Sequence, residues 1–254
     1  MGQKIESNSN KKIKELAALQ RSKKERCSAG LFVLEGDRII RDAVSSRREL
    51  VEAVFVSETY AGQKGLPVDD AFIVSDSVLS HVCETVTDQG ILATVRQEPL
   101  LRKEEELGDK DNILILEDIQ DPGNLGTIIR TAEAAGVDAV IMSSGTVDIF
   151  SPKVVRSTMG SILRVPFTYA ENMEETIGRL KNNGHEVYAA HLKGASDMRK
   201  TPFSPRRAII IGNEGRGISE PVAMLADKRV FIPMHGEVES LNAAIAAAIL
   251  MYHE

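Results

Sequence analysis

The stretch "NILILEDIQDPGNLGTIIRTAEAAGVDAVIMS", residues 112–143, decides the fold class of this chain. It opens and closes with nearly continuous apolar runs, residues 112–118 and 138–143, which are typical of strands buried on both faces. Between them, residues 123–136 have the composition of a helix that Gly136 ends. Two buried strands joined by a helix predict a parallel sheet that is covered on both faces.

The remainder of the C-terminal half repeats this alternation. Residues 151–163 predict a helix with Pro152 in its first turn, where no backbone N–H is needed. The alanine- and isoleucine-rich run near the end predicts a well-buried final helix. Further strands are expected at residues 186–191, at 207–215, where the strand runs into a glycine turn, and at 229–234.

The N-terminal half predicts a smaller α/β domain at residues 28–97, preceded by a basic helix within residues 1–27. The helix is indicated at residues 11–26 by the apolar spacing of Ile13, Leu16 and Leu19. A charged stretch, residues 98–111, is typical of a linker, so the larger domain is expected at 112–254. Within the smaller domain, strands are expected at 31–36, 51–57, 71–75 and 90–97, and helices at 37–47 and 76–86.

Length and composition indicate a stable globular protein. With 254 residues, 43% of them hydrophobic, the chain can form one large core or two smaller ones. It has no apolar run near the ~20 residues of a membrane span, and its N-terminus lacks the apolar core of a secretory signal, so we expect a cytoplasmic protein. The two cysteines, Cys27 and Cys83, have no paired spacing and no histidine cluster nearby, so neither a disulfide nor a metal site is predicted.

Charge is distributed unevenly along the chain. The net charge is −6, yet the first 30 residues hold eight Lys or Arg against three Glu, a net charge of +5. Such a segment, which includes Lys23 and Lys24, suits a contact with nucleic-acid phosphates, although a solvated helix would have the same composition.

Three stretches combine glycine or polar residues at positions where ligands bind in parallel sheets. They are "LEDIQDPGNLGTIIR" at 116–130, "IIIGNEGRGIS" at 209–219, and "GEVESLNAAIAAAILMYHE" at 236–254. Each one alone can be a turn or a helix cap, and either Ser240 or Asn242 could cap the last helix. A single cap would leave the second polar group unexplained. No G-x-G-x-x-G or P-loop motif is present, which disfavours a dinucleotide-dependent enzyme of the doubly wound type or an ATP site.

Together, the three stretches resemble the three ordered motifs of the SpoU/TrmH family of RNA ribose 2'-O-methyltransferases. The resemblance extends over most of residues 31–252. It is carried by Asn124-x-Gly126-x-x-x-Arg130, by Gly212-Asn213-Glu214-Gly215, and by Ile232-Pro233 followed by Glu239-Ser240-Leu241-Asn242.

The resemblance implies a SPOUT-type α/β catalytic domain with a mostly parallel sheet and a deep trefoil knot, preceded by a small substrate-binding domain. It also implies S-adenosyl-L-methionine as the cofactor and a homodimer as the assembly. The residues that would bind the cofactor are Gly212, Asn213, Gly215, Ile232, Pro233, Leu241 and Asn242.

The same resemblance implies Arg130 as the catalytic residue. Because a guanidinium with a pKa above ~12 is a poor base, we expect it to fix a phosphate and stabilise charge on the 2'-oxygen. Asn124, Glu214, Ser240 and Asn242 would orient the reactants. Arg156, Lys23 and Lys24 are expected to contact RNA. The expected substrate is 23S ribosomal RNA; the alternatives are transfer RNA and a catalytically silent RNA-binding homologue.

Overall fold

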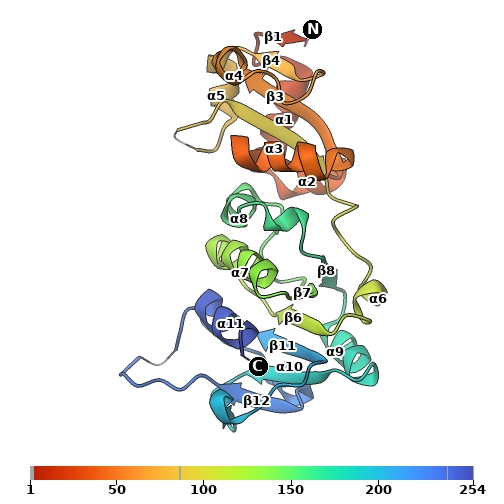
Figure 1. Ribbon diagram of the computed structural model, residues 1–254, viewed down its shortest axis with the longest axis vertical. Coiled ribbons are helices and arrows are strands. Elements are labelled where there is room, and N and C mark those ends of the chain that lie inside the picture. Colours follow the sequence, from red (N-terminus) through yellow and green to blue (C-terminus); the bar gives the residue numbers. More distant parts are fainter. Residues whose placement is uncertain (1–2, 86, 239, 254) are drawn as a thin grey trace. The chain divides into compact units, whose positions relative to one another are not determined.

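The computed structural model describes residues 3–85, 87–238 and 240–253. The chain forms two compact units (Figure 1). The first unit contains residues 1–100 and 148–163, and the second contains residues 101–147 and 164–254.

The second unit is built on a seven-stranded sheet in which every strand pairing is parallel. The strand order is β10-β12-β9-β11-β6-β7-β8. This sheet confirms the predicted fold class. Its strands are β6 (Asn112–Leu116), β7 (Ala139–Ser143), β8 (Phe167–Ala170), β9 (Glu186–Ala190), β10 (Ser196–Asp197), β11 (Arg207–Ile211) and β12 (Lys228–Phe231).

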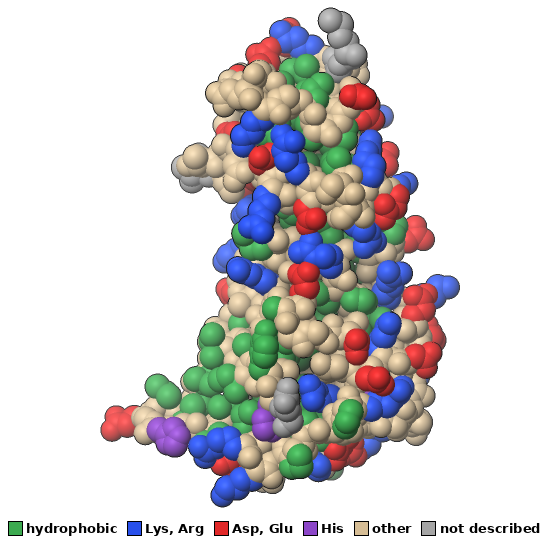
Figure 2. All heavy atoms as spheres, viewed as in Figure 1, with side chains coloured by type: hydrophobic (Ala, Val, Ile, Leu, Met, Phe, Trp, Pro, Cys, Tyr) green, Lys and Arg blue, Asp and Glu red, His purple; other side chains and the backbone are tan. Residues whose placement is uncertain are grey.

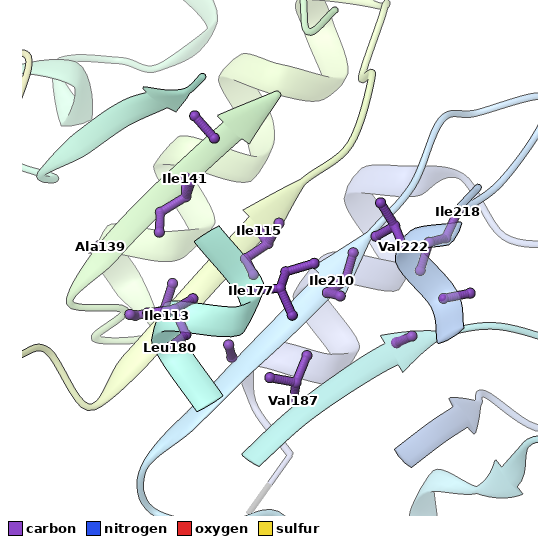
Figure 3. Packing of buried hydrophobic residues seen from close by; sticks show 14 of the residues in the cluster. Ile113, Ile115, Ala139, Ile141, Ile177, Leu180, Val187, Ile210, Ile218 and Val222 are labelled. Carbon is purple, nitrogen blue, oxygen red and sulfur yellow. The ribbon is translucent and has the colours of Figure 1, made fainter. Parts of the chain in front are cut away.

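One face of this sheet packs against helices α9 (Met173–Asn182) and α10 (Glu220–Leu225). Alternate strand residues point to this face, as Ile113 and Ile115 of β6 do in Figure 3. They meet Ile177 and other apolar side chains of the two helices in one buried cluster.

Helices α7 (Pro122–Ala134) and α11 (Ala243–Met251) pack against each other, and α11 also contacts β11. The Asp121 side chain caps α7 by accepting from the Asn124 backbone N–H at 2.8 Å. The second unit also holds α6 (Glu104–Leu107) and a 3₁₀ turn at Met198–Lys200.

The first unit contains a five-stranded mixed sheet in the order β1-β4-β3-β5-β2. Its strands are β1 (Lys4–Ile5), β2 (Leu31–Glu35), β3 (Val51–Ser57), β4 (Phe72–Val74) and β5 (Ile91–Arg96). Its helices are α1 (Lys11–Arg21), α2 (Lys23–Ala29), α3 (Asp37–Ser46), α4 (Glu58–Lys64), α5 (Asp76–Val82) and α8 (Pro152–Ser157), with 3₁₀ turns at Arg48–Leu50 and Ser161–Leu163.

The basic segment differs from its prediction as one helix over residues 11–26. Two helices replace it, because the Ser22 side chain accepts a hydrogen bond from the Glu25 backbone N–H at 3.3 Å and caps α2. The apolar residues of α1 lie in the core of the first unit. In α2, the Arg26 guanidinium is buried and forms an ion pair of 2.6 Å with Asp148. The segment is therefore a packed part of this unit.

The stretch expected to be a linker holds the short helix α6, and its Leu107 belongs to the core of the second unit. Across residues 3–85, 87–238 and 240–253, no helix is long and apolar enough to span a membrane.

Candidate active site

A cavity of about 500 Å³ opens in the second unit where β9, β11 and β12 end. These three strands are neighbours in the sheet, so their carboxyl ends meet at one edge. The wall combines apolar side chains, among them Ile211, Ile218 and Leu241, with backbone groups of a glycine-rich turn. Such a mixture is typical of a pocket that holds a small organic molecule.

The glycine-rich turn after β11 is too tight for a side chain at its first position. A Cβ on Gly212 would lie 2.3 Å from the backbone carbon of Gly217. The turn is closed by two backbone hydrogen bonds between Asn213 and Gly217, at 2.9 and 3.1 Å. The Asn213 side chain holds this turn against the loop after β6. It donates to the Asp118 carbonyl at 2.8 Å and accepts from the Gly215 backbone N–H, within the turn, at 2.9 Å.

Glu214 of this turn reaches the loop before α7. Its carboxylate accepts hydrogen bonds from the backbone N–H groups of Gln120 and Asp121 and from the Asn124 side chain, each at 3.0 Å. Burial alone would raise the pKa of the Glu214 carboxyl, but these three donors outweigh it, so the pKa lies below its ordinary value. Glu214 is therefore a carboxylate at neutral pH.

Asn242, rather than Ser240, caps the final helix. Its side-chain oxygen caps α11 by accepting from the Ala244 and Ile245 backbone N–H groups at 2.9 and 3.3 Å. Its side-chain nitrogen donates to the Asn124 side-chain oxygen at 2.8 Å. One residue thus caps the helix and continues a polar chain from Asn242 through Asn124 to Glu214, which we call the amide–carboxylate chain.

The structure places the predicted site residues in four groups. Asn124 and Asn242 form the amide–carboxylate chain with Glu214, and neither is among the residues that line the cavity. Arg130 lies on α7, with its side chain exposed. Arg156, Lys23 and Lys24 belong to the first unit. The residues that line the cavity are Gly212, Asn213, Glu214, Gly215, Ile232, Ser240 and Leu241, and Pro233 follows Ile232 directly in the chain.

Glu239 lies outside the described residues. Among the residues that the structure does describe, no group of three or more His, Cys, Asp or Glu side chains is placed to hold a metal ion.

Residues 191–193, which follow β9, also line the cavity and were not predicted as part of the site. The strand itself was predicted, and its carboxyl end carries His191 and Lys193. The rule that ligands bind beyond the ends of parallel strands would have identified this stretch if it had been applied to every strand.

Residues 111–252 match the family described as SpoU rRNA Methylase family, and residues 10–93 match the MRM3-like substrate binding domain. The chain belongs to the SpoU rRNA methylase family. This membership confirms the family resemblance. The cavity lies inside the matched region and is lined by residues of the second and third motifs, and Glu214 of its wall bonds Asn124 of the first motif.

Named relatives cover almost the whole chain. A 23S rRNA (guanosine(2553)-2'-O)-methyltransferase of Bacillus subtilis is 36% identical, and the match spans 98% of both chains. An AdoMet-bound rRNA methyltransferase structure from Sinorhizobium meliloti is 29% identical with a TM-score of 0.88, covering 99% of this chain and 96% of that one. The SpoU methyltransferase AviRb of Streptomyces viridochromogenes, in complex with AdoMet, is 25% identical with a TM-score of 0.79 and covers 96% of each chain.

Proposed function

We propose that this protein transfers a methyl group from S-adenosyl-L-methionine to a ribose 2'-hydroxyl of RNA, with 23S ribosomal RNA as the substrate. The observation that carries the proposal is the amide–carboxylate chain, which joins all three family motifs beside the cavity. The named relatives agree with the enzyme class, the cofactor and the ribosomal substrate.

The cavity suits S-adenosylmethionine in size and chemistry. Its volume of about 500 Å³ lies in the range of pockets that hold ligands of this size. Ile218 and Leu241 offer apolar surface to the adenine, and the backbone of Gly212 and of Ile232 is assigned to hydrogen bonds with its polar edge. When bound, this cofactor supplies an activated methyl group, so the protein needs chiefly to align the reactants and to accommodate one proton.

We assign to Arg130 the fixing of an RNA phosphate and the stabilisation of negative charge that develops on the 2'-oxygen. Its exposure on α7 supports this role, because a phosphate in solution can reach the guanidinium. Asn124, Glu214 and Asn242 are already bonded to one another, and this supports a role in holding the motifs in register. Ser240 lines the cavity and is assigned to reactant orientation.

We propose that the protein is a homodimer that buries the outer face of α11. Ile245, Ile249 and Tyr252 are 50%, 36% and 61% exposed and recur at helical spacing on one side of this helix. Figure 2 shows hydrophobic side chains gathered over the region where Figure 1 draws α7 and α11. An isologous contact between two copies would cover this surface.

The trefoil knot also remains a prediction that rests on family membership.

Lys23 and Lys24 have exposed side chains, and Arg156 is half-buried. These three positive charges support an electrostatic contribution of the first unit to RNA binding. Because bacteria make and modify their ribosomal RNA in the cytoplasm and the named relatives are bacterial, we propose a cytoplasmic location.

The decisive experiment incubates the protein with methyl-labelled S-adenosylmethionine and either 23S ribosomal RNA or transfer RNA, and then maps resistance to alkaline hydrolysis, which 2'-O-methylation confers. We expect label at a single ribose of the ribosomal RNA. Label only in transfer RNA would change the substrate. Cofactor binding without transfer to any RNA would indicate the catalytically silent homologue.

A further inference from the structure

The first unit holds a second cavity, of about 230 Å³, which the proposed reaction does not use. Three segments form it: the corner between β2 and α3, the stretch before β5, and the end of α8 with the turn that follows. The residues that line it are Glu35, Gly36, Arg38, Ile39, Thr85, Thr87, Gln89, Val155, Arg156 and Met159.

Glu35, at the base of this cavity, has its carboxylate oxygens occupied. One oxygen accepts from the backbone N–H and the hydroxyl of Thr85, and the other accepts from the Glu84 backbone N–H at 3.2 Å and the Gln20 side chain at 3.5 Å. The side chain is only 6% exposed, so these four donors hold a buried charge.

Arg156 faces this carboxylate without completing a hydrogen bond to it. The Arg156 Nη1 atom lies 3.7 Å from a Glu35 oxygen, which is close enough for attraction but too long for a hydrogen bond. The same atom is buried and has no hydrogen-bond partner among the described residues. A buried N–H group of a guanidinium is costly to leave unsatisfied, so this atom is suited to receive an acceptor from a ligand.

The rest of the wall separates into a cationic part and an apolar part. Arg38 lines the cavity with an exposed side chain and supplies a second guanidinium. Ile39, Val155 and Met159 supply apolar surface. Met159 lines the cavity although its residue is 56% exposed, so a large apolar side chain is open to both the cavity and solvent. Its φ of 51° is a conformation that few non-glycine residues adopt.

We propose that this cavity binds one unstacked nucleotide of the RNA substrate, at a site separate from the cofactor cavity. Its volume of about 230 Å³ is below the ~300 to 1,000 Å³ of pockets that enclose a whole drug-sized ligand, so the nucleotide is only partly enclosed and remains joined to the rest of the RNA. Arg38 and Arg156 bind the phosphate, and the base lies on Ile39, Val155 and Met159.

Two features favour a nucleotide over a free anion. An anion site needs donors but no apolar wall, whereas one side of this cavity is apolar. Thr87 and Gln89 also line it, and a hydroxyl and a side-chain amide nitrogen can bond the edge of a base or a ribose hydroxyl. The inference rests on the proposed action on RNA, but its test does not require methyl transfer.

Direct binding is measured on the full chain labelled with ¹³C at the methionine methyl groups. The Met159 signal is assigned with Met159→Leu, and uridine monophosphate, adenosine monophosphate and inorganic phosphate are titrated separately. We expect both nucleotides to shift the Met159 signal, and phosphate to shift it much less. Absence of any shift, or the same shift with phosphate as with the nucleotides, would overturn the proposal.

The matched variants are Arg156→Gln and Arg38→Gln, with Arg48→Gln as the control for the same change of charge on the first unit. Loss of a charge-assisted hydrogen bond should weaken nucleotide binding about tenfold in the first two variants. If Arg156→Gln does not fold, Arg38→Gln decides, since its exposed side chain is not part of the core. Equal weakening in Arg48→Gln would show a general charge effect and contradict the site.

A kinetic measurement separates this inference from the proposed function. With 23S ribosomal RNA, Arg38→Gln should raise the KM for RNA about tenfold and leave kcat and cofactor affinity unchanged. If the wild-type protein methylates RNA and Arg38→Gln has an unchanged KM, the nucleotide site is wrong and the function stands. If the wild-type protein methylates no RNA, the function fails, and the nucleotide titration still tests the cavity.

Discussion

Two sets of polar side chains, one in each unit, are arranged in opposite ways. In the second unit, the side chains of Asn124, Glu214 and Asn242 are bonded to one another over distances of 2.8 to 3.0 Å. In the first unit, the side chains of Lys23 and Lys24 extend into solvent. Interlocked groups define one geometry and are costly to disturb, whereas exposed charges act through a field that salt weakens. The two sets should therefore respond differently to substitution.

The largest effect is expected at Arg130, an exposed charge that is assigned a role in the methyl-transfer step itself. Arg130→Ala should lower the rate of methyl transfer by about 10² to 10³-fold, because it removes a positive charge that acts in the transition state. Cofactor affinity should not change, since this side chain is not part of the described lining of the cavity. Single-turnover kinetics and calorimetry measure the two quantities. Arg102→Ala, an exposed arginine of the same unit, is the control. Near-normal turnover in Arg130→Ala would remove this residue from the mechanism.

The next effect separates the two roles of the Asn242 side chain, capping α11 and donating to Asn124. Asn242→Ala loses the cap and the donation to Asn124, and should lower stability by about 1 kcal/mol and cofactor affinity about tenfold. Asn242→Asp keeps a capping oxygen but cannot donate to Asn124. We expect thermal denaturation to show near-normal stability for the Asp variant, and calorimetry to show the same weak cofactor binding as the Ala variant. If the Asp variant binds the cofactor normally, the bond to Asn124 is not what supports the cavity.

A smaller effect concerns the dependence of stability on pH. Because the folded-state pKa of Glu214 lies below its ordinary value, the carboxylate stabilises the fold above the unfolded-state pKa of ~4.3, and this contribution is lost as the pH falls through the folded-state value. Glu214→Gln should therefore melt below the wild type at pH 7, and the difference should close in acid. The partial exposure of Glu214 keeps the difference to a few degrees. Glu171→Gln, at an exposed position, should show no such difference at either pH. A gap that widens in acid would contradict the assigned direction.

Much of the second unit could be predicted from the sequence because its strands are buried on both faces. Residues 113–116 are all buried, so β6 has a continuous apolar run that few other structures produce. Strand β8 was missed because it is short and lies at the edge of the sheet. Helix α9 was missed although Asn172 caps it and Ile177 and Leu180 have helical spacing. That signal was present and was not used.

The candidate site could be predicted only as separate motifs. Glu214 bonds to backbone groups of Gln120 and Asp121, more than 90 residues away, and no local pattern encodes that contact. The break between α1 and α2, by contrast, has a local signal, because Ser22 followed by Glu25 is a capping box. Sequence periodicity identified most of the strands and helices of the second unit's core, whereas the contacts between distant loops could be seen only in the folded structure.

The smallest effect is expected from the exposed charges of the first unit, and it tests whether they contact RNA at all. Deleting residues 1–26 would be a poor test, because it removes Ile13, Leu16 and Leu19 from the core of this unit. The double variant Lys23→Ala and Lys24→Ala leaves that core intact, since both side chains are exposed.

If each lysine neutralises one phosphate, the slope of log affinity against log salt should become shallower by about 1.4 to 1.8 in this double variant, and RNA affinity should fall most at low salt. Filter binding of 23S ribosomal RNA at several salt concentrations measures both, with melting temperature as the check on folding. The pair Glu25→Gln and Glu15→Gln, which removes two negative charges from the same helices, should change the affinity in the opposite direction if a general field is responsible. An unchanged salt slope in the lysine variant would mean that Lys23 and Lys24 do not contact RNA and that α2 is a solvated helix. The two sets of polar groups would then differ in burial and hydrogen bonding but not in how they act on RNA.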